Sequence, residues 1–137
     1  MRYVWSEELA TGYDVIDKQH KQLIAAANAL FDAYRSGKRR EEVERTMEFL
    51  VGYTIKHFAD EEELQRKHSY PDYHMHRQFH GDFKGEVRAL SAELFRDGPT
   101  DDLISKVYAT IGAWLVNHFK SEDLKLAAYV QSKTQAR

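Results

Sequence analysis

The sequence predicts an all-α protein, an up-down-up-down four-helix bundle with an extended N-terminal arm. Apolar residues recur at steps of three and four through four long stretches, which is the period of a helix face that packs on a core. Short segments with glycine or proline separate the stretches, so neighbouring helices should run antiparallel. We expect one domain over residues 1–137, with the arm at 1–16 and helices at about 17–36, 40–67, 71–96 and 101–131.

The arm is predicted because residues 1–16 lack a helical period and Gly12 interrupts their apolar residues. It should lie extended across the bundle. Asp17 is a suitable N-cap for the first helix. His20 then opens an inward-facing stripe that continues with Leu23, Ile24, Ala27, Leu30, Phe31 and Tyr34.

The second helix has polar residues on its buried face. Its inward positions alternate by four and three, as in a coiled-coil seam. They are Val43, Met47, Leu50, Thr54, His57, Glu61 and Leu64. A buried carboxylate is costly unless its charge is compensated, and a cation bound by His57 and Glu61 would compensate it.

The third helix repeats this arrangement, with Pro71 expected in its first turn. Its seam positions are Tyr73, His76, His80, Phe83, Val87, Leu90 and Leu94. His76 and His80 are four residues apart, and four residues of an α-helix turn through roughly 400°. Both imidazoles should therefore leave the same face of the helix.

The last helix should be distorted near its middle. Thr100 or Asp101 is expected to cap it, and its seam reaches His118. Asp123 follows five residues later, and the apolar residues beyond keep step with Asp123 rather than with His118. Five residues of an α-helix turn through about 500°, which leaves the two side chains about 140° apart. A single π-type turn between them would bring both onto one face.

Seven potential metal ligands thus fall on or beside the buried seams of four helices. They are His20, His57, Glu61, His76, His80, His118 and Asp123. Imidazole and carboxylate groups at helical spacing predict a dinuclear metal site inside the bundle. The alternative is a plain bundle with hydrogen-bonded core histidines. It would explain any single histidine, but it does not explain why all seven residues fall on or beside the seams. His68 and His74 fall outside the pattern and are expected on the surface.

Composition excludes several classes of function. The chain has no cysteine, which excludes disulfides, thiolate metal sites and cysteine nucleophiles. Its formal net charge of −2 argues against a nucleic-acid partner. The N-terminus lacks the apolar core of a signal peptide, and no apolar run approaches the roughly 18 residues that span a membrane. We expect a cytoplasmic protein with no membrane partner, monomeric, whose protein partner is unknown.

The ligand pattern resembles the signature of the hemerythrins, with detail closest to bacteriohemerythrins. The residues around it fit as well, including Gln19-His20-Lys21, His57-Phe58, Tyr70-Pro71 and Trp114-Leu115. The resemblance implies two non-haem iron ions with a bridging oxo or hydroxo group. It assigns His76, His80 and His118 to one iron and His20 and His57 to the other. Glu61 and Asp123 would bridge both.

The resemblance also implies where dioxygen binds. With five imidazoles, two bridging carboxylates and one bridging oxygen, a pair of six-coordinate ions keeps one position open, on the iron with two histidines. Large apolar residues would enclose it, at Leu23, Phe58, Trp114, Leu115 and Phe119. Gln65 stands where bacteriohemerythrins commonly carry an apolar residue, so a polar group is expected near the centre if Gln65 points inward.

Three functions fit these expectations. The first is reversible dioxygen binding for storage, transport or delivery, without enzymatic turnover. The second is an oxygen or redox sensor that acts through a partner. The third is a di-iron enzyme of the peroxidase or nitric-oxide-handling type, and a secondary activity of this type is compatible with the first function. The ligand set favours the first function. Carboxylate-rich sites stabilise highly oxidised iron, whereas this set has only two carboxylates and five imidazoles.

Overall fold

The computed structural model describes residues 3–135, with side chains described as far as residue 132. Within this range the chain forms helices and no strand, which confirms the all-α prediction. The elements are a 3-10 turn η1 (Glu7–Leu9), α1 (Asp14–Arg35), α2 (Arg40–Lys67), α3 (Tyr73–Asp97), α4 (Asp101–His118), a π-helical turn η2 (Phe119–Asp123) and α5 (Leu124–Gln135). None of these helices combines the length and apolarity needed to cross a membrane.

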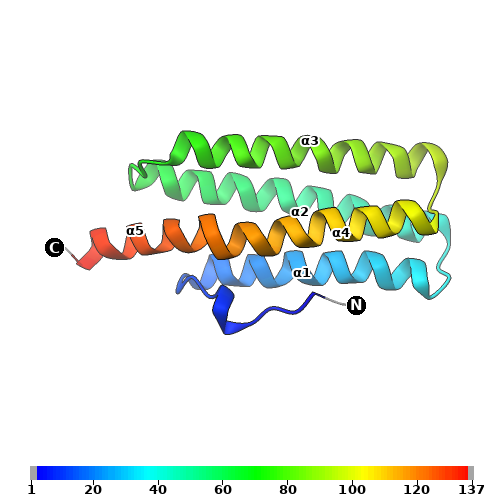
Figure 1. Ribbon diagram of the computed structural model, residues 1–137, viewed down its shortest axis with the longest axis horizontal. Helices are drawn as coiled ribbons and strands as arrows, with labels where there is room; N and C mark the ends of the chain where they lie inside the picture. Colours follow the sequence, from blue (N-terminus) through cyan, green and yellow to red (C-terminus); the bar gives the residue numbers. More distant parts are fainter. Residues whose placement is uncertain (1–2, 136–137) are drawn as a thin grey trace.

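The helices form the predicted up-down-up-down bundle. Successive helices run antiparallel, and α4, η2 and α5 form one continuous rod (Figure 1). Helix α1 packs against α2 and α4, and α3 packs against α2 and α4. The arm before α1 lies along the outside of the bundle (Figure 1), and its residue Leu9 is buried against the core.

Two apolar clusters fill the interior. The larger draws on α1 to α4 and η2, and includes Leu23, Phe58, Leu115 and Phe119. The smaller is built from Tyr70, Leu126 and Val130 near the end of the bundle where α5 terminates. Along the last rod, Phe119 belongs to the first cluster and Leu126 to the second. The polar seam positions between them are therefore walled by apolar side chains on both sides.

The start of α1 differs from the prediction. The helix begins at Asp14, and Asp17 is not its N-cap, because the Asp17 N–H already donates to the Tyr13 carbonyl at 2.8 Å. The Asp17 carboxylate instead accepts hydrogen bonds from the backbone N–H and the hydroxyl of Thr11, each at 2.8 Å. Asp17 therefore fastens the end of the arm to the first turn of the helix, and the arm ends at Tyr13.

The start of α3 also differs. Pro71 lies in the turn before the helix, which begins at Tyr73. Ser69 adopts a left-handed backbone conformation with φ of 53°, and the Tyr70 N–H donates to the Gln65 carbonyl at 3.0 Å. This tight turn occupies the residues up to Asp72, so helical hydrogen bonding starts only after it.

The start of α4 is capped as predicted. The Thr100 hydroxyl accepts a hydrogen bond from the Leu103 N–H at 3.1 Å. Thr100 is thus the N-cap, rather than Asp101, which is the first residue of the helix. This cap satisfies a backbone donor that would otherwise lack a partner at the helix start.

Candidate metal centre

All seven candidate ligands converge in the middle of the bundle. The residues are His20 from α1, His57 and Glu61 from α2, His76 and His80 from α3, His118 from α4 and Asp123 from η2. Each is buried, and none is more than 5% exposed. The seam periodicity explains why they share one interior, since residues three and four apart lie on one face of a helix.

The π-helical turn confirms the predicted distortion between His118 and Asp123. It spans Phe119–Asp123, so one wider turn separates the two residues. His118 Nε2 lies 3.2 Å from Asp123 Oδ1, and both side chains face the interior. Asp123 could not reach this position from a regular α-helix that also kept His118 on the seam.

Glu61 uses its two oxygens on two different groups of histidines. Oε1 lies 2.8 Å from His76 Nε2 and 3.3 Å from His80 Nε2. Oε2 lies 3.3 Å from His57 Nε2 and 3.9 Å from His20 Nε2. The Glu61 carboxylate thus lies between the imidazoles of His76 and His80 on one side and those of His57 and His20 on the other.

Asp123 divides the histidines in the same way. Oδ2 lies 2.9 Å from His20 Nε2, whereas Oδ1 lies 3.1 Å from His76 Nε2 and 3.2 Å from His118 Nε2. Two donor groups result, each able to hold a cation, and they share both carboxylates. One contains His20 and His57, and the other contains the three remaining histidines.

Without metal, protons on the imidazoles compensate the buried carboxylates. Burial by itself would lower the pKa values of His20 and His76, but hydrogen bonds to Asp123 and Glu61 raise both from 6.5 to about 9. Burial would raise the pKa of Glu61, yet hydrogen bonds from four histidines hold it well below its usual range. The pKa of Asp123 is also lowered, despite burial and the charge of Glu61, by His118 and His20. Metal ions must displace these protons in order to bind.

The stability of the metal-free protein should therefore fall at alkaline pH. The raised pKa values mean that His20 and His76 hold protons more tightly in the folded chain, so their stabilisation is complete below about pH 6.5 and is lost as the pH rises through about 9. We expect a lower melting temperature at about pH 10 than at about pH 7, measured by circular dichroism. The metal-loaded protein, whose imidazoles carry no such protons, is the control. An unchanged melting temperature of the metal-free protein would contradict this prediction.

Two of the imidazoles are held by side chains that the ligand pattern did not single out. Gln19 Oε1 lies 2.7 Å from His57 Nδ1, and Gln19 Nε2 donates to Asp60 Oδ2 at 2.8 Å. Because the amide nitrogen of Gln19 is used on Asp60, its oxygen accepts from the His57 Nδ1–H, which leaves Nε2 free to bind a metal. Glu62 Oε2 plays the same role for His80 Nδ1 at 2.9 Å. Both stand next to a ligand in the chain, which is the only sequence signal that points to them.

Loss of the Gln19 contact should weaken metal binding at the pair of imidazoles. Gln19→Leu removes the acceptor that orients His57, and loss of such a contact typically lowers metal affinity about 10- to 100-fold. The measurement is the retention of metal against increasing concentrations of a chelator. Gln22→Leu is the matched control, since Gln22 is an exposed residue of the same helix. Equal retention in the two variants would show that Gln19 does not support the site.

The five predicted pocket residues belong to the apolar core or pack against it, and three of them contact the cluster. Leu23, Phe58, Leu115 and Phe119 are buried, and Trp114 is half-buried. Three aromatic rings stack on candidate ligands, with ring centroids 3.8 Å apart for Phe58 and His80, 3.6 Å for Phe119 and His20, and 4.4 Å for Trp114 and His118. They shield the imidazoles from water and restrict their rotation.

The other singled-out histidines lie apart from the cluster. His74 is exposed and His68 is half-buried at the end of α2, and neither belongs to a donor group. Gln65, in contrast, is fully buried, four residues after Glu61. Its side chain does point inward.

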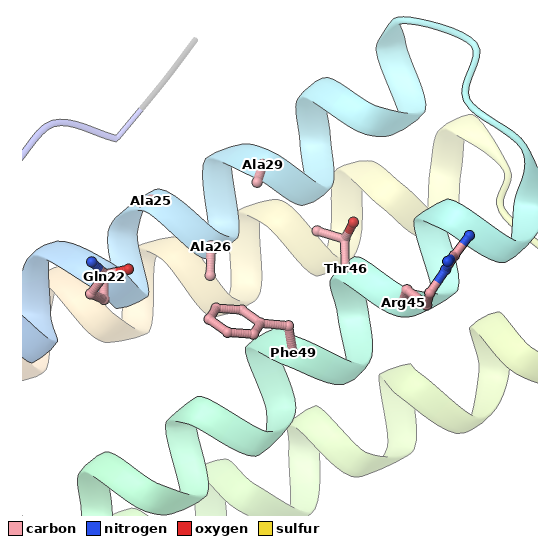
Figure 2. Close-up of a pocket in the computed structure, with 7 residues that line it drawn as sticks. All are labelled: Gln22, Ala25, Ala26, Ala29, Arg45, Thr46 and Phe49. Carbon is pink, nitrogen blue, oxygen red and sulfur yellow. The ribbon is translucent and has the colours of Figure 1, made fainter.

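Two hollows lie between α1 and α2, and only one of them reaches the cluster. One of about 420 Å³ lies between the outer faces of α1 and α2, where the ring of Phe49 projects toward Ala26 (Figure 2). None of the seven residues that line it is a candidate ligand. Another, of about 260 Å³, is lined by residues that include Gln19, Asp60 and Glu61, and so reaches the wall of the cluster from the α1–α2 side.

Comparison with known proteins agrees with this geometry. Residues 11–130 match the family model described as the hemerythrin HHE cation binding domain. The chain is 34% identical over 129 residues to a bacteriohemerythrin of Pseudomonas paraeruginosa, covering 94% of this chain and 80% of the relative. It is 31% identical over 123 residues to a myohemerythrin of Sipunculus nudus, covering 90% and 89% of the two chains. A crystal structure of wild-type hemerythrin superimposes with a TM-score of 0.83 at 25% identity, covering 92% and 95%.

Proposed function

Because this chain belongs to the hemerythrin family, we propose that it binds dioxygen reversibly at a pair of non-haem iron ions. The observation that carries the proposal is the division of the two carboxylates. Glu61 and Asp123 each direct one oxygen to the group of two histidines and the other to the group of three. This is the arrangement that two bridged metal ions require.

The residues present fit the two ions. The Nε2 atoms of His20 and His57 and all four carboxylate oxygens of Glu61 and Asp123 are buried, and among the described residues they have no hydrogen-bond partner outside the cluster itself. A buried group of imidazoles and carboxylates is costly unless its charges are compensated, and bound cations would compensate them. His76, His80 and His118 would hold one ion, and His20 and His57 the other. When bound, the iron pair supplies the redox-active centre for dioxygen.

The unequal number of histidines decides where dioxygen would bind. An ion held by His76, His80 and His118 would have its positions filled, whereas an ion held by His20 and His57 would keep one for a small ligand. Phe119 stacks on His20, and Leu23 is buried nearby on α1, one turn after His20. The surroundings of that position are apolar.

The chain's own contribution is to orient the imidazoles and exclude water. Gln19 and Glu62 fix the tautomers of His57 and His80. The stacked rings of Phe58, Trp114 and Phe119 keep bulk water away from the site, and water would otherwise favour irreversible oxidation of the iron. We propose a binding protein rather than an enzyme, because a histidine-rich centre with two carboxylates favours reversible binding over strong oxidation. We also propose that the protein is monomeric and cytoplasmic.

Anaerobic reduction followed by exposure to oxygen tests the proposal. The metal content is measured on the same sample, and visible absorption is followed throughout. We expect two iron ions per chain and a charge-transfer band that develops with oxygen and disappears under argon. A band that never forms, direct conversion to a stable oxidised spectrum, or a protein purified without iron and unable to take it up would each overturn the proposal.

A further inference from the structure

Two buried polar side chains at one end of the centre have no partner among the described residues. Gln65 is fully buried, and both polar atoms of its amide lack a hydrogen bond. Tyr70 is 5% exposed, and its hydroxyl is also buried without a partner. Roughly 90% or more of buried polar groups in native proteins are paired, so three unpaired atoms in one region point to a bound polar molecule.

Gln65 lies beyond Glu61 along α2, on the side away from Phe58. Along α2, Phe58 precedes Glu61 by three residues and Gln65 follows it by four, so the two lie on opposite sides of Glu61 along the helix axis. Phe58 packs in the apolar cluster that contains the predicted pocket. Gln65 therefore faces the opposite end of the site.

Tyr70 is held next to Gln65 and lies beside His76, a proposed ligand that contacts both carboxylates. Its N–H donates to the Gln65 carbonyl at 3.0 Å, and its ring centroid lies 6.4 Å from that of His76. A tyrosine hydroxyl carries its proton at neutral pH, so Tyr70 offers a hydrogen-bond donor here. Leu126 and Val130 close this region from α5.

The groups are chemically complementary. A glutamine amide offers two N–H donors and a carbonyl acceptor, and the tyrosine hydroxyl offers one donor. The carboxylate of Glu61, one turn before Gln65 on the same helix face, and that of Asp123 offer only acceptors, and each oxygen would keep a lone pair after binding one metal ion. An internal water needs two to four polar partners, and this set provides them.

We propose that Gln65 and Tyr70 hold an internal water that donates a hydrogen bond to the bridging carboxylates. Donation draws negative charge away from the metal ligands and so favours the less positively charged, reduced metal pair. Gln65 and Tyr70 thereby raise the reduction potential of the centre and keep it competent to bind dioxygen. This effect on the centre rests on the function proposed above.

The first test is a high-resolution crystal structure of the metal-free protein and of its Gln65→Met variant. We expect an ordered water within hydrogen-bonding distance of the Gln65 amide and the Tyr70 hydroxyl, and its loss in the variant. A dry region around Gln65 and Tyr70 would overturn the proposal. Because this measurement needs no iron, it remains valid even if the protein proves not to be a dioxygen binder.

The second test is the reduction potential of the iron-loaded protein. Gln65→Met and Tyr70→Phe should both shift it to lower values and shorten the lifetime of the reduced form in air. Two variants are the matched controls. Leu64→Met introduces methionine at the position before Gln65, and Tyr129→Phe removes the hydroxyl of a tyrosine whose ring centroid lies 5.3 Å from that of Tyr70. Equal potentials in each variant and its control would overturn the proposed effect on the metal pair. A wild-type protein without a di-iron spectrum would instead overturn the proposed function.

Discussion

Replacement of Glu61 by alanine is expected to abolish binding of the metal pair. Glu61 directs its two oxygens to histidines of both donor groups, so in the proposed centre its loss would remove one ligand from each ion and one of the two bridging carboxylates. We expect fewer than two iron ions per chain and no bridged di-iron absorption. Metal analysis and visible spectroscopy on the purified variant check this.

Glu63→Ala is the matched control for Glu61→Ala. Glu63 is an exposed residue of the same helix that pairs with Arg66 outside the cluster. Its loss should leave two iron ions per chain. If Glu61→Ala retained both ions and the bridged spectrum, the assignment of Glu61 as a bridging ligand would be wrong. Circular dichroism separates loss of metal from loss of the helical fold.

Truncation of Phe58 should have the largest effect on stability. Phe58 is fully buried and stacks on His80 with ring planes 2° apart. It also packs against Phe83 and Trp114, at centroid distances of 6.1 and 5.7 Å. Substitution of such a residue by alanine typically costs about 3–5 kcal/mol, from lost burial and from the cavity left behind. Urea unfolding of Phe58→Ala should show a loss of this size.

Phe49→Ala provides the comparison for Phe58→Ala. Phe49 is on the same helix but is 53% exposed, at the edge of the hollow between α1 and α2. Its truncation should change the free energy of unfolding by no more than about 0.5 kcal/mol. A similar loss in both variants would mean that Phe58 is not the packing centre inferred here. Phe58→Ala should also shorten the lifetime of the oxygen-bound form, because it opens the predicted pocket to water.

The sequence by itself determined the features that depend on local geometry. The helical period placed the bundle helices and their inward faces, and the spacing of four within His57–Glu61 and His76–His80 put each pair on one face. The extra residue between His118 and Asp123 predicted the π-helical turn, because the rotation per residue of an α-helix is constant. The helix starts were predicted less well. Asp17 lies inside α1 and binds Thr11 of the arm, and Pro71 lies in the turn before α3.

Only the tertiary structure decided how the seven side chains meet. The division of the Glu61 and Asp123 oxygens depends on how four helices are rotated and shifted against one another, which spacing along one helix does not specify. Gln19 reaches His57 across 38 residues of sequence, and a single helix pattern carries no sign of that contact. The absence of a hydrogen-bond partner among the described residues for the buried Gln65 amide is likewise visible only in the folded structure. Such long-range contacts have no local period, which is why they require the folded structure.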